Sequence, residues 1–135
     1  KLPIAIHSRD AAQDTIQIMR ASRAEEIGGV IHCYSYSKES ARDFLNMGFY
    51  FGIGGVVTFK NAKKLKEAVA YIPLSNIVLE TDAPYLTPEP FRGKRNDSSK
   101  LTYVAQAIAD IKHIPVDEVY AETWKNAHQM YKIQK

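Results

Sequence analysis

Residues 77–84 have the sequence IVLETDAP, in which a short apolar run ends on the carboxylates of Glu80 and Asp82. Two earlier stretches have the same design: LPIAI at residues 2–6 is followed by His7, and GVI at residues 29–31 is followed by His32. Short apolar runs rich in β-branched residues, separated by helix-length amphipathic stretches, are typical of parallel strands in an α/β sheet. Chemistry in such folds gathers at the carboxyl ends of the strands. Two imidazoles and a carboxylate are therefore expected there, a set that indicates a metal-assisted hydrolase.

The amphipathic stretches between these runs predict the helices. We expect helices near residues 11–26, 38–48 and 62–72, capped by Asp10, Ser37 and Asn61, followed after the fourth strand by an irregular loop over 84–99. A long helix carrying Leu101 to Ile111 comes next, and a last helix runs from Pro115 toward Tyr131 and restarts at Thr123. A further strand is expected at residues 49–53. The order β-α-β-α-β-α-β-loop-α-α predicts an α/β fold of parallel β/α units, either half of an eight-stranded β/α barrel or a small open sheet.

Side-chain alternation along the strands favours the barrel. If His7, His32 and Asp82 face the interior, then Ala5, Val30 and Glu80 do so as well. Ala5 and Val30 suit a packed interior, whereas an unpaired buried carboxylate costs several kcal/mol. Two interpretations of Glu80 follow: it orients a metal-binding imidazole or a nearby basic group, or it lies solvated at the wet mouth of the barrel.

Length, composition and charge limit the classes of protein. At 135 residues and 45% hydrophobic content, the chain fits a single domain, residues 1–135. Its net charge of +3 is too small by itself to indicate nucleic-acid binding. No apolar stretch approaches the roughly 20 residues of a membrane span, so the protein is expected to be soluble. Cys33 is its single cysteine, which fits a reducing compartment and predicts a cytoplasmic location. The start, Lys1–Ile4, leads directly into a strand without an initiator Met, which suggests a fragment.

Four stretches carry a resemblance to a known family: IHSRDA at residues 6–11, GVIHCYS at 29–35, YFGIGGVVTF at 50–59, and LETDAPYLTP at 79–88 continuing into FRGKRN at 91–96. Together they closely resemble the TatD family of metal-dependent deoxyribonucleases, which are amidohydrolase-like β/α barrels. The resemblance implies strands 5 to 8 of a TIM-type (β/α)8 barrel, so that residues 1–135 would form its carboxyl-terminal half. NDSS at residues 96–99 departs from the family's usual Asn-Glu-Pro, which concerns local loop contacts.

The resemblance also implies a metal site. His7 and His32 would match the family's two later metal-binding histidines, and Asp82 its metal-binding aspartate, with two divalent ions (Mg, Mn or Zn) in the complete protein. Bound metal lowers the pKa of its water from 15.7 toward about 7, and Asp82 could also be the catalytic group that orients or deprotonates this water. The family's His-x-His pair and its metal-bridging Glu have no match in this sequence. The missing amino-terminal half is therefore an expected partner, and the isolated chain is expected to self-associate.

Three further features of the sequence have competing interpretations. Arg92, Lys94 and Arg95 form either a solvated loop or a clamp for the phosphates of a DNA substrate. Cys33 is predicted to turn away from His32 by strand alternation, which favours a small buried apolar group over a thiol nucleophile. The glycines of GIGG at residues 52–55 predict close backbone packing at the barrel rim.

Three hypotheses of function follow. The leading one is a divalent-metal-dependent nuclease that hydrolyses phosphodiester bonds in DNA through metal-activated water. The second is a metal-dependent hydrolase of esters, amides or lactones. The third is a noncatalytic barrel half or binding module, because half of the expected ligands are absent.

Overall fold

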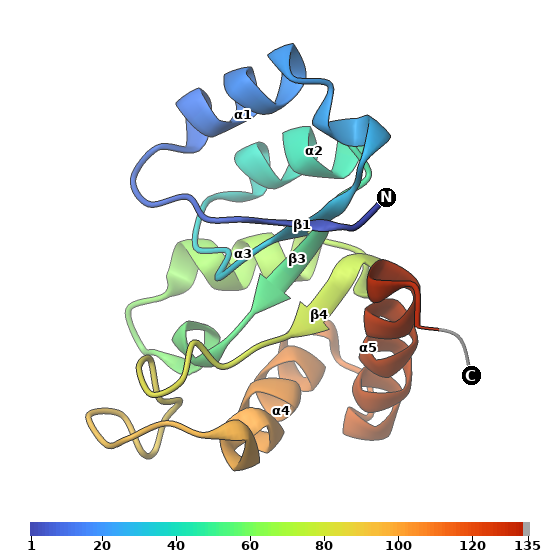
Figure 1. The fold of residues 1–135 in the computed structure, drawn as a ribbon. Helices are drawn as coiled ribbons and strands as arrows, with labels where there is room; N and C mark the ends of the chain where they lie inside the picture. The colour runs from blue at the N-terminus through green and yellow to red at the C-terminus, as the bar shows by residue number, and fades with distance from the viewer. Residues whose placement is uncertain (134–135) are drawn as a thin grey trace.

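Four short parallel strands form one sheet in the order β1-β2-β3-β4 (Figure 1). The structure is a computed structural model that describes residues 1–133. The strands are β1 (Ile4–Ile6), β2 (Gly29–Ile31), β3 (Tyr50–Ile53) and β4 (Ile77–Leu79). The helices are α1 (Ala12–Ala21), α2 (Lys38–Asn46), α3 (Lys63–Tyr71), α4 (Leu101–Lys112) and α5 (Val116–Tyr131). Short 3₁₀ turns are η1 (Ala24–Glu26), η2 (Gly55–Thr58), η3 (Leu74–Asn76) and η4 (Ser98–Lys100). The predicted α/β class and the order of strands and helices are confirmed.

The main core lies between one face of the sheet and the helices α1 to α4. Four strand residues on this face, Ile31, Phe51, Ile53 and Ile77, are at most 1% exposed and pack with apolar side chains of these helices. Successive strand residues point to opposite faces, so one face of the three- and four-residue strands supplies the whole sheet side of this core. Its burial is the main apolar contribution to the stability of the fold.

The opposite face of the sheet carries a smaller apolar cluster. Val30 and Val78 are buried there against Met130 of α5, whereas Ala5 on the edge strand β1 is exposed. The predicted alternation therefore holds for Val30, which lies away from the main core. The α5 helix contacts β4, η3 and β2 and in Figure 1 lies beside β4.

A buried amide fastens α5 to the sheet. The Asn126 side chain is fully buried, and its Nδ2 donates to the carbonyls of Leu74 and Ile77 at 2.8 Å each. These carbonyls belong to η3 and to the first residue of β4. The hydrogen bonds therefore fix the start of the strand that ends at the expected site.

Several predicted helix boundaries are wrong. The first helix ends at Ala21, and Arg23 is left-handed with φ 55°, so residues 24–26 form a separate 3₁₀ turn. Asp10 has φ 51° rather than the extended backbone of a capping residue, and Asn61 precedes a helix that begins after Ala62 without a side-chain cap. Thr123 lies inside the continuous α5, where its hydroxyl bonds the carbonyl four residues earlier and no restart is needed. Ser37 does cap α2, as predicted, by accepting the backbone N–H of Ser40.

The segments that follow the four strands lie on the same side of the molecule, opposite the amino terminus (Figure 1). The longest of them is the predicted irregular loop, which runs from the end of β4 to η4. This side of the sheet carries the expected site. No helix within residues 1–133 is long and apolar enough to cross a membrane.

Candidate active site

A cavity of about 550 Å³ opens at the carboxyl ends of β1, β2 and β4. His7, His32 and Asp82 all line it, so the structure brings together the three residues expected to bind metal. Its other lining residues come from the segments after these strands, from η2 and from the loop after Asp82: Ser8, Arg9, Asp10, Cys33, Ser35, Val56, Tyr85 and Leu86. Three separate strands therefore contribute polar side chains to one hollow.

His32 is the centre of this arrangement. Its Nδ1 lies 3.0 Å from Oε2 of Glu80, and its Nε2 lies 3.2 Å from Oδ1 of Asp82. The ring of His7 is tilted toward it, with 6.4 Å between the two ring centroids. Because each imidazole nitrogen faces a different carboxylate, the ring is fixed in orientation from both sides.

Glu80 reaches His32 across β3, and Gly52 leaves the room for it. A Cβ atom on Gly52 would lie only 2.0 Å from Oε2 of Glu80. The Glu80 side chain is 16% exposed, and its Oε1 is buried without a hydrogen-bond partner among the described residues. This geometry matches the carboxylate that orients an imidazole, and it does not match a freely solvated side chain at the barrel mouth. The predicted close backbone packing at the GIGG glycines is confirmed at Gly55, whose Cβ would lie 2.1 Å from the carbonyl oxygen of Leu86, whereas the close neighbour of Gly52 is a side chain.

The prediction that Cys33 turns away from His32 is wrong. The β2 strand ends at Ile31, and Cys33 adopts a left-handed backbone with φ 50°, so strand alternation no longer applies to it. Cys33 consequently lines the same cavity as His32. Burial, followed by the charges of Glu80 and Asp82, raises the pKa of its thiol to about 12. A thiol with this pKa is protonated at neutral pH, so Cys33 still does not fit a nucleophile.

Asn96 is a residue of the site that the sequence reasoning missed. It is 3% exposed, and its Nδ2 donates to the carbonyls of Thr81 and Tyr85 at 2.8 Å each. Its backbone N–H also donates to the carbonyl of Pro84 at 3.0 Å. These bonds close the loop around Asp82. The only signal in the sequence is an amide at the end of the FRGKRN motif, a type of residue that normally marks a polar turn.

Arg9 is a second residue that was missed. It lies two positions after His7 and lines the cavity with an exposed side chain. A cation beside the carboxylates and imidazoles can attract a negatively charged substrate. Its place in the IHSRDA motif was the available signal.

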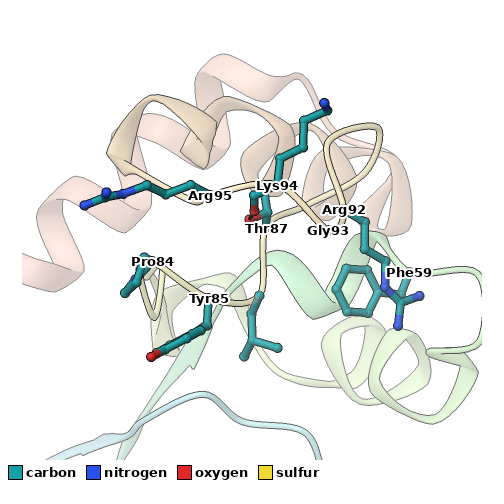
Figure 2. A pocket seen from close by; sticks show the side chains of 9 residues that line it. Phe59, Pro84, Tyr85, Thr87, Arg92, Gly93, Lys94 and Arg95 are labelled. Atoms are coloured by element: carbon teal, nitrogen blue, oxygen red, sulfur yellow. Dashed lines mark hydrogen bonds between the residues drawn. The ribbon is translucent and has the colours of Figure 1, made fainter.

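The basic loop lines a second cavity, of about 650 Å³ (Figure 2). Arg92, Lys94 and Arg95 all contribute to its wall, so the three residues predicted to bind phosphate do line one hollow. Tyr85 and Leu86 line both cavities, which are therefore neighbours along the loop that follows Asp82. An anion could extend from one cavity into the other.

The donor set of the first cavity fits a divalent metal in chemistry. Two imidazoles and a carboxylate are ordinary ligands of zinc and related ions, and Glu80 supplies the carboxylate that such imidazoles usually contact. Within residues 1–133, however, no three His, Cys, Asp or Glu side chains form a group that could hold a metal ion as they stand. His32 and Asp82 instead bond each other. The ligand types are present, but the described residues do not hold them in a metal-binding arrangement.

Comparison with known proteins supplies the family. The model of the family described as TatD related DNase matches residues 1–132. The chain belongs to the TatD family. It is 48% identical over 132 residues to the uncharacterized metal-dependent hydrolase YabD of Bacillus subtilis, an alignment that covers 98% of this chain and 52% of that protein. It is 40% identical over 131 residues to the uncharacterized metal-dependent hydrolase YcfH of Escherichia coli K12, covering 97% of this chain and 49% of that protein.

A solved structure extends this similarity to the fold. The crystal structure of YJJV, a TatD homologue from E. coli K12, superimposes with a TM-score of 0.89 and 26% sequence identity, covering 98% of this chain and 51% of that one. This TatD-family chain therefore spans about half the length of the relatives that it matches.

Proposed function

We propose that this chain is the carboxyl-terminal half, strands 5 to 8, of a TatD-family barrel that hydrolyses DNA phosphodiester bonds with the help of two divalent metal ions (Mg, Mn or Zn). The observation that carries the proposal is the meeting of His7, His32 and Asp82 in one cavity that opens beside a basic one. The names of the relatives support a metal-dependent hydrolase. We also propose a cytoplasmic location, which agrees with the free thiol of Cys33.

In this proposal each residue has a stated task. His7, His32 and Asp82 hold metal, and a bound ion would polarise the phosphate and lower the pKa of a water molecule toward 7. We propose that Asp82 also orients that water or accepts its proton, which its position beside His32 in the cavity supports. Glu80 keeps the His32 ring in position through Nδ1. The basic side chains Arg92, Lys94 and Arg95 bind the negative charge of the DNA backbone.

The missing ligands would come from the rest of the barrel. The half of the relatives' length outside this chain is proposed to supply the His-x-His pair and the bridging Glu, and to cover the free edges of β1 and β4. The lack of a group that could hold a metal ion within residues 1–133 agrees with this division. Residues 1–135 alone are then proposed to be a single barrel half with little catalysis of its own.

A hydrolase of esters, amides or lactones is the alternative. The three cations beside the reaction cavity favour phosphate over neutral substrates. To separate the two, cleavage of a DNA oligonucleotide by the full-length protein in Mn²⁺ or Mg²⁺ should be compared with hydrolysis of simple esters and lactones. Cleavage of DNA that is abolished by chelation supports the proposal, whereas hydrolysis of esters without cleavage of DNA overturns it.

Matched variants assign the activity to this cavity. His32→Asn and Asp82→Asn should each lower cleavage at least a hundredfold, because each removes a proposed metal ligand. Loss of a residue that only orients a ligand already lowers metal affinity or activity by about 10–100-fold. His128→Asn is the control, since His128 lies on α5 and its Nδ1 faces the Trp124 carbonyl. Equal losses in His128→Asn and His32→Asn would mean that the effect is structural.

A further inference from the structure

The second cavity is basic. Its wall contains Arg92, Lys94 and Arg95 and no acidic residue. Three other cations of the described chain, Arg20, Arg23 and Lys100, do form ion pairs with carboxylates. No ion pair involves the three cations of the cavity within residues 1–133. Unpaired cations around a hollow create a positive potential that attracts an anion.

Arg92 differs from the other two cations because an aromatic ring holds it. Its guanidinium carbon lies 3.8 Å from the centroid of the Phe59 ring, while Phe59 itself is 6% exposed. Figure 2 shows Arg92 against Phe59 on one side of the cavity and Tyr85 on the other, with Lys94 and Arg95 extending from the loop in different directions. Lys94 and Arg95 are therefore not arranged as one clamp. Arg92 has a fixed position, since stacking restricts a side chain that is otherwise flexible.

The loop that carries Arg92 is tied to the segment that carries Phe59. The backbone N–H of Glu89 donates to the hydroxyl of Thr58 at 2.8 Å, next to Phe59. The hydroxyl of Thr87 donates to the carbonyl of Lys94 and closes the loop on itself. The two partners of the stacked pair thus belong to one connected unit, and the pair is a prearranged feature of the cavity.

We infer that this cavity is a second anion subsite, in which Arg92 binds a phosphate group adjacent to the phosphate that is cleaved and Phe59 is the positioning residue for Arg92. The inference rests on the proposed function. Stacking covers one face of the guanidinium and leaves its N–H edges free for a two-pronged contact with phosphate oxygens. Tyr85, 71% exposed, lies on the border of the two cavities, so an oligonucleotide that occupies both passes its ring. Lys94 and Arg95 contribute attraction without the fixed geometry.

The test measures binding without catalysis. A fluorescently labelled thymidine trinucleotide is titrated by anisotropy into the full-length protein in EDTA, together with two versions in which one or the other phosphate is a neutral methylphosphonate. Arg92→Ala should weaken binding of the all-phosphate probe about tenfold, the value of a hydrogen-bonded charge. The same change should have no effect on the version that lacks the phosphate in this subsite. Arg42→Ala, an exposed arginine of α2, is the control.

Phe59→Leu tests the positioning role. Loss of a cation–π contact at an exposed site predicts about two- to fivefold weaker binding, and this loss should disappear when Arg92 is already alanine. Arg92→Lys, which keeps the charge and the fold but lacks the planar fork, should also weaken binding several-fold. The inference would be overturned if Phe59→Leu weakened binding equally in the wild type and in Arg92→Ala. It would also be overturned if Arg92→Ala weakened binding of all three probes equally. Cleavage of the same probe in Mn²⁺ is measured separately. Phosphate-dependent binding without cleavage would contradict the proposed function but would still support the phosphate subsite.

Discussion

Replacing Gly52 by alanine is expected to separate Glu80 from His32 while the fold stays intact. The new Cβ would lie 2.0 Å from Oε2 and 2.8 Å from Cδ of Glu80. Both atoms are at the far end of a flexible side chain, so Glu80 can swing aside. In doing so it loses its 3.0 Å contact with Nδ1 of His32. The variant therefore removes one contact without removing either residue that makes it.

The size of the effect can be worked from these contacts. A hydrogen bond to a charged group contributes about 1.5–3 kcal/mol to stability. Alanine in place of glycine in a strand stabilises the fold by about 0.5–1 kcal/mol, because glycine loses more conformational freedom on folding. The free energy of unfolding should therefore fall by about 1–2 kcal/mol. Metal affinity should fall by about 10–100-fold, which is the usual effect of losing the group that orients a ligating imidazole.

Two measurements on the full-length protein check this prediction. Urea unfolding gives the change in stability, and calorimetric titration with Mn²⁺ or Zn²⁺ gives the change in metal affinity. Glu80→Gln should weaken metal binding on the wild-type background and have little further effect on Gly52→Ala, because Glu80 is already displaced there. Gly55→Ala is the contrast: its Cβ would lie 2.1 Å from the backbone carbonyl oxygen of Leu86, which cannot swing aside, so it should destabilise the fold more. A Gly52→Ala protein with wild-type metal affinity would refute the orienting role of Glu80.

Other changes test the buried amides, a surface carboxylate and the edges of the sheet. Asn96→Ala should lower the free energy of unfolding by about 2–4 kcal/mol, because two carbonyls lose their donor, and urea unfolding measures it against the exposed neighbour variant Arg95→Ala. Asn126→Ala should cost a similar amount, about 2–4 kcal/mol, by detaching α5 from the start of β4, with Lys125→Ala as control; an unchanged midpoint would contradict it. Hydrogen bonds from Ser99 lower the pKa of the Asp97 carboxyl in the folded protein. The charged Asp97 side chain therefore stabilises the fold above the pKa that it has in the unfolded chain, and this stabilisation is lost as the pH falls through its pKa in the folded protein. The wild type and Asp97→Asn should consequently converge in thermal stability at the acidic end of a pH series. The isolated 135-residue chain should dimerise or aggregate in light scattering through the free edges of β1 and β4, and a monodisperse, DNA-cleaving monomer would show that these residues supply all the ligands themselves.

The parts of the fold that sequence predicted well are those set by apolar periodicity. The short apolar run IVL at residues 77–79 forms a strand as predicted, and the helix face around Leu65 and Val69 is buried as its spacing predicts. Helix starts were predicted less well. Asp10 and Asn61 have the side chains of capping residues, but capping also needs a particular backbone conformation, which tertiary packing decides.

The site shows the same division. The metal-binding types of His7, His32 and Asp82 were visible, because each follows an apolar run. Cys33 was misplaced, because its orientation depends on where β2 stops and on a single left-handed residue. The need for glycine at position 52 depends on a side chain 28 positions later in the chain, because a Cβ atom on Gly52 would collide with the Glu80 carboxylate. No local pattern contains such a long-range contact.

Asn96 connects the two cavities physically. Its Nδ2 holds the carbonyl of Thr81, next to Asp82, and the carbonyl of Tyr85, which borders both hollows. One buried amide thus helps to set the position of the Asp82 carboxylate in the first cavity and that of the wall that this cavity shares with the basic one. If both cavities hold parts of one oligonucleotide, Asn96→Ala should weaken metal binding and phosphate-dependent probe binding together. Arg92→Ala should weaken only the second, because Arg92 contacts Phe59 and lies outside the first cavity.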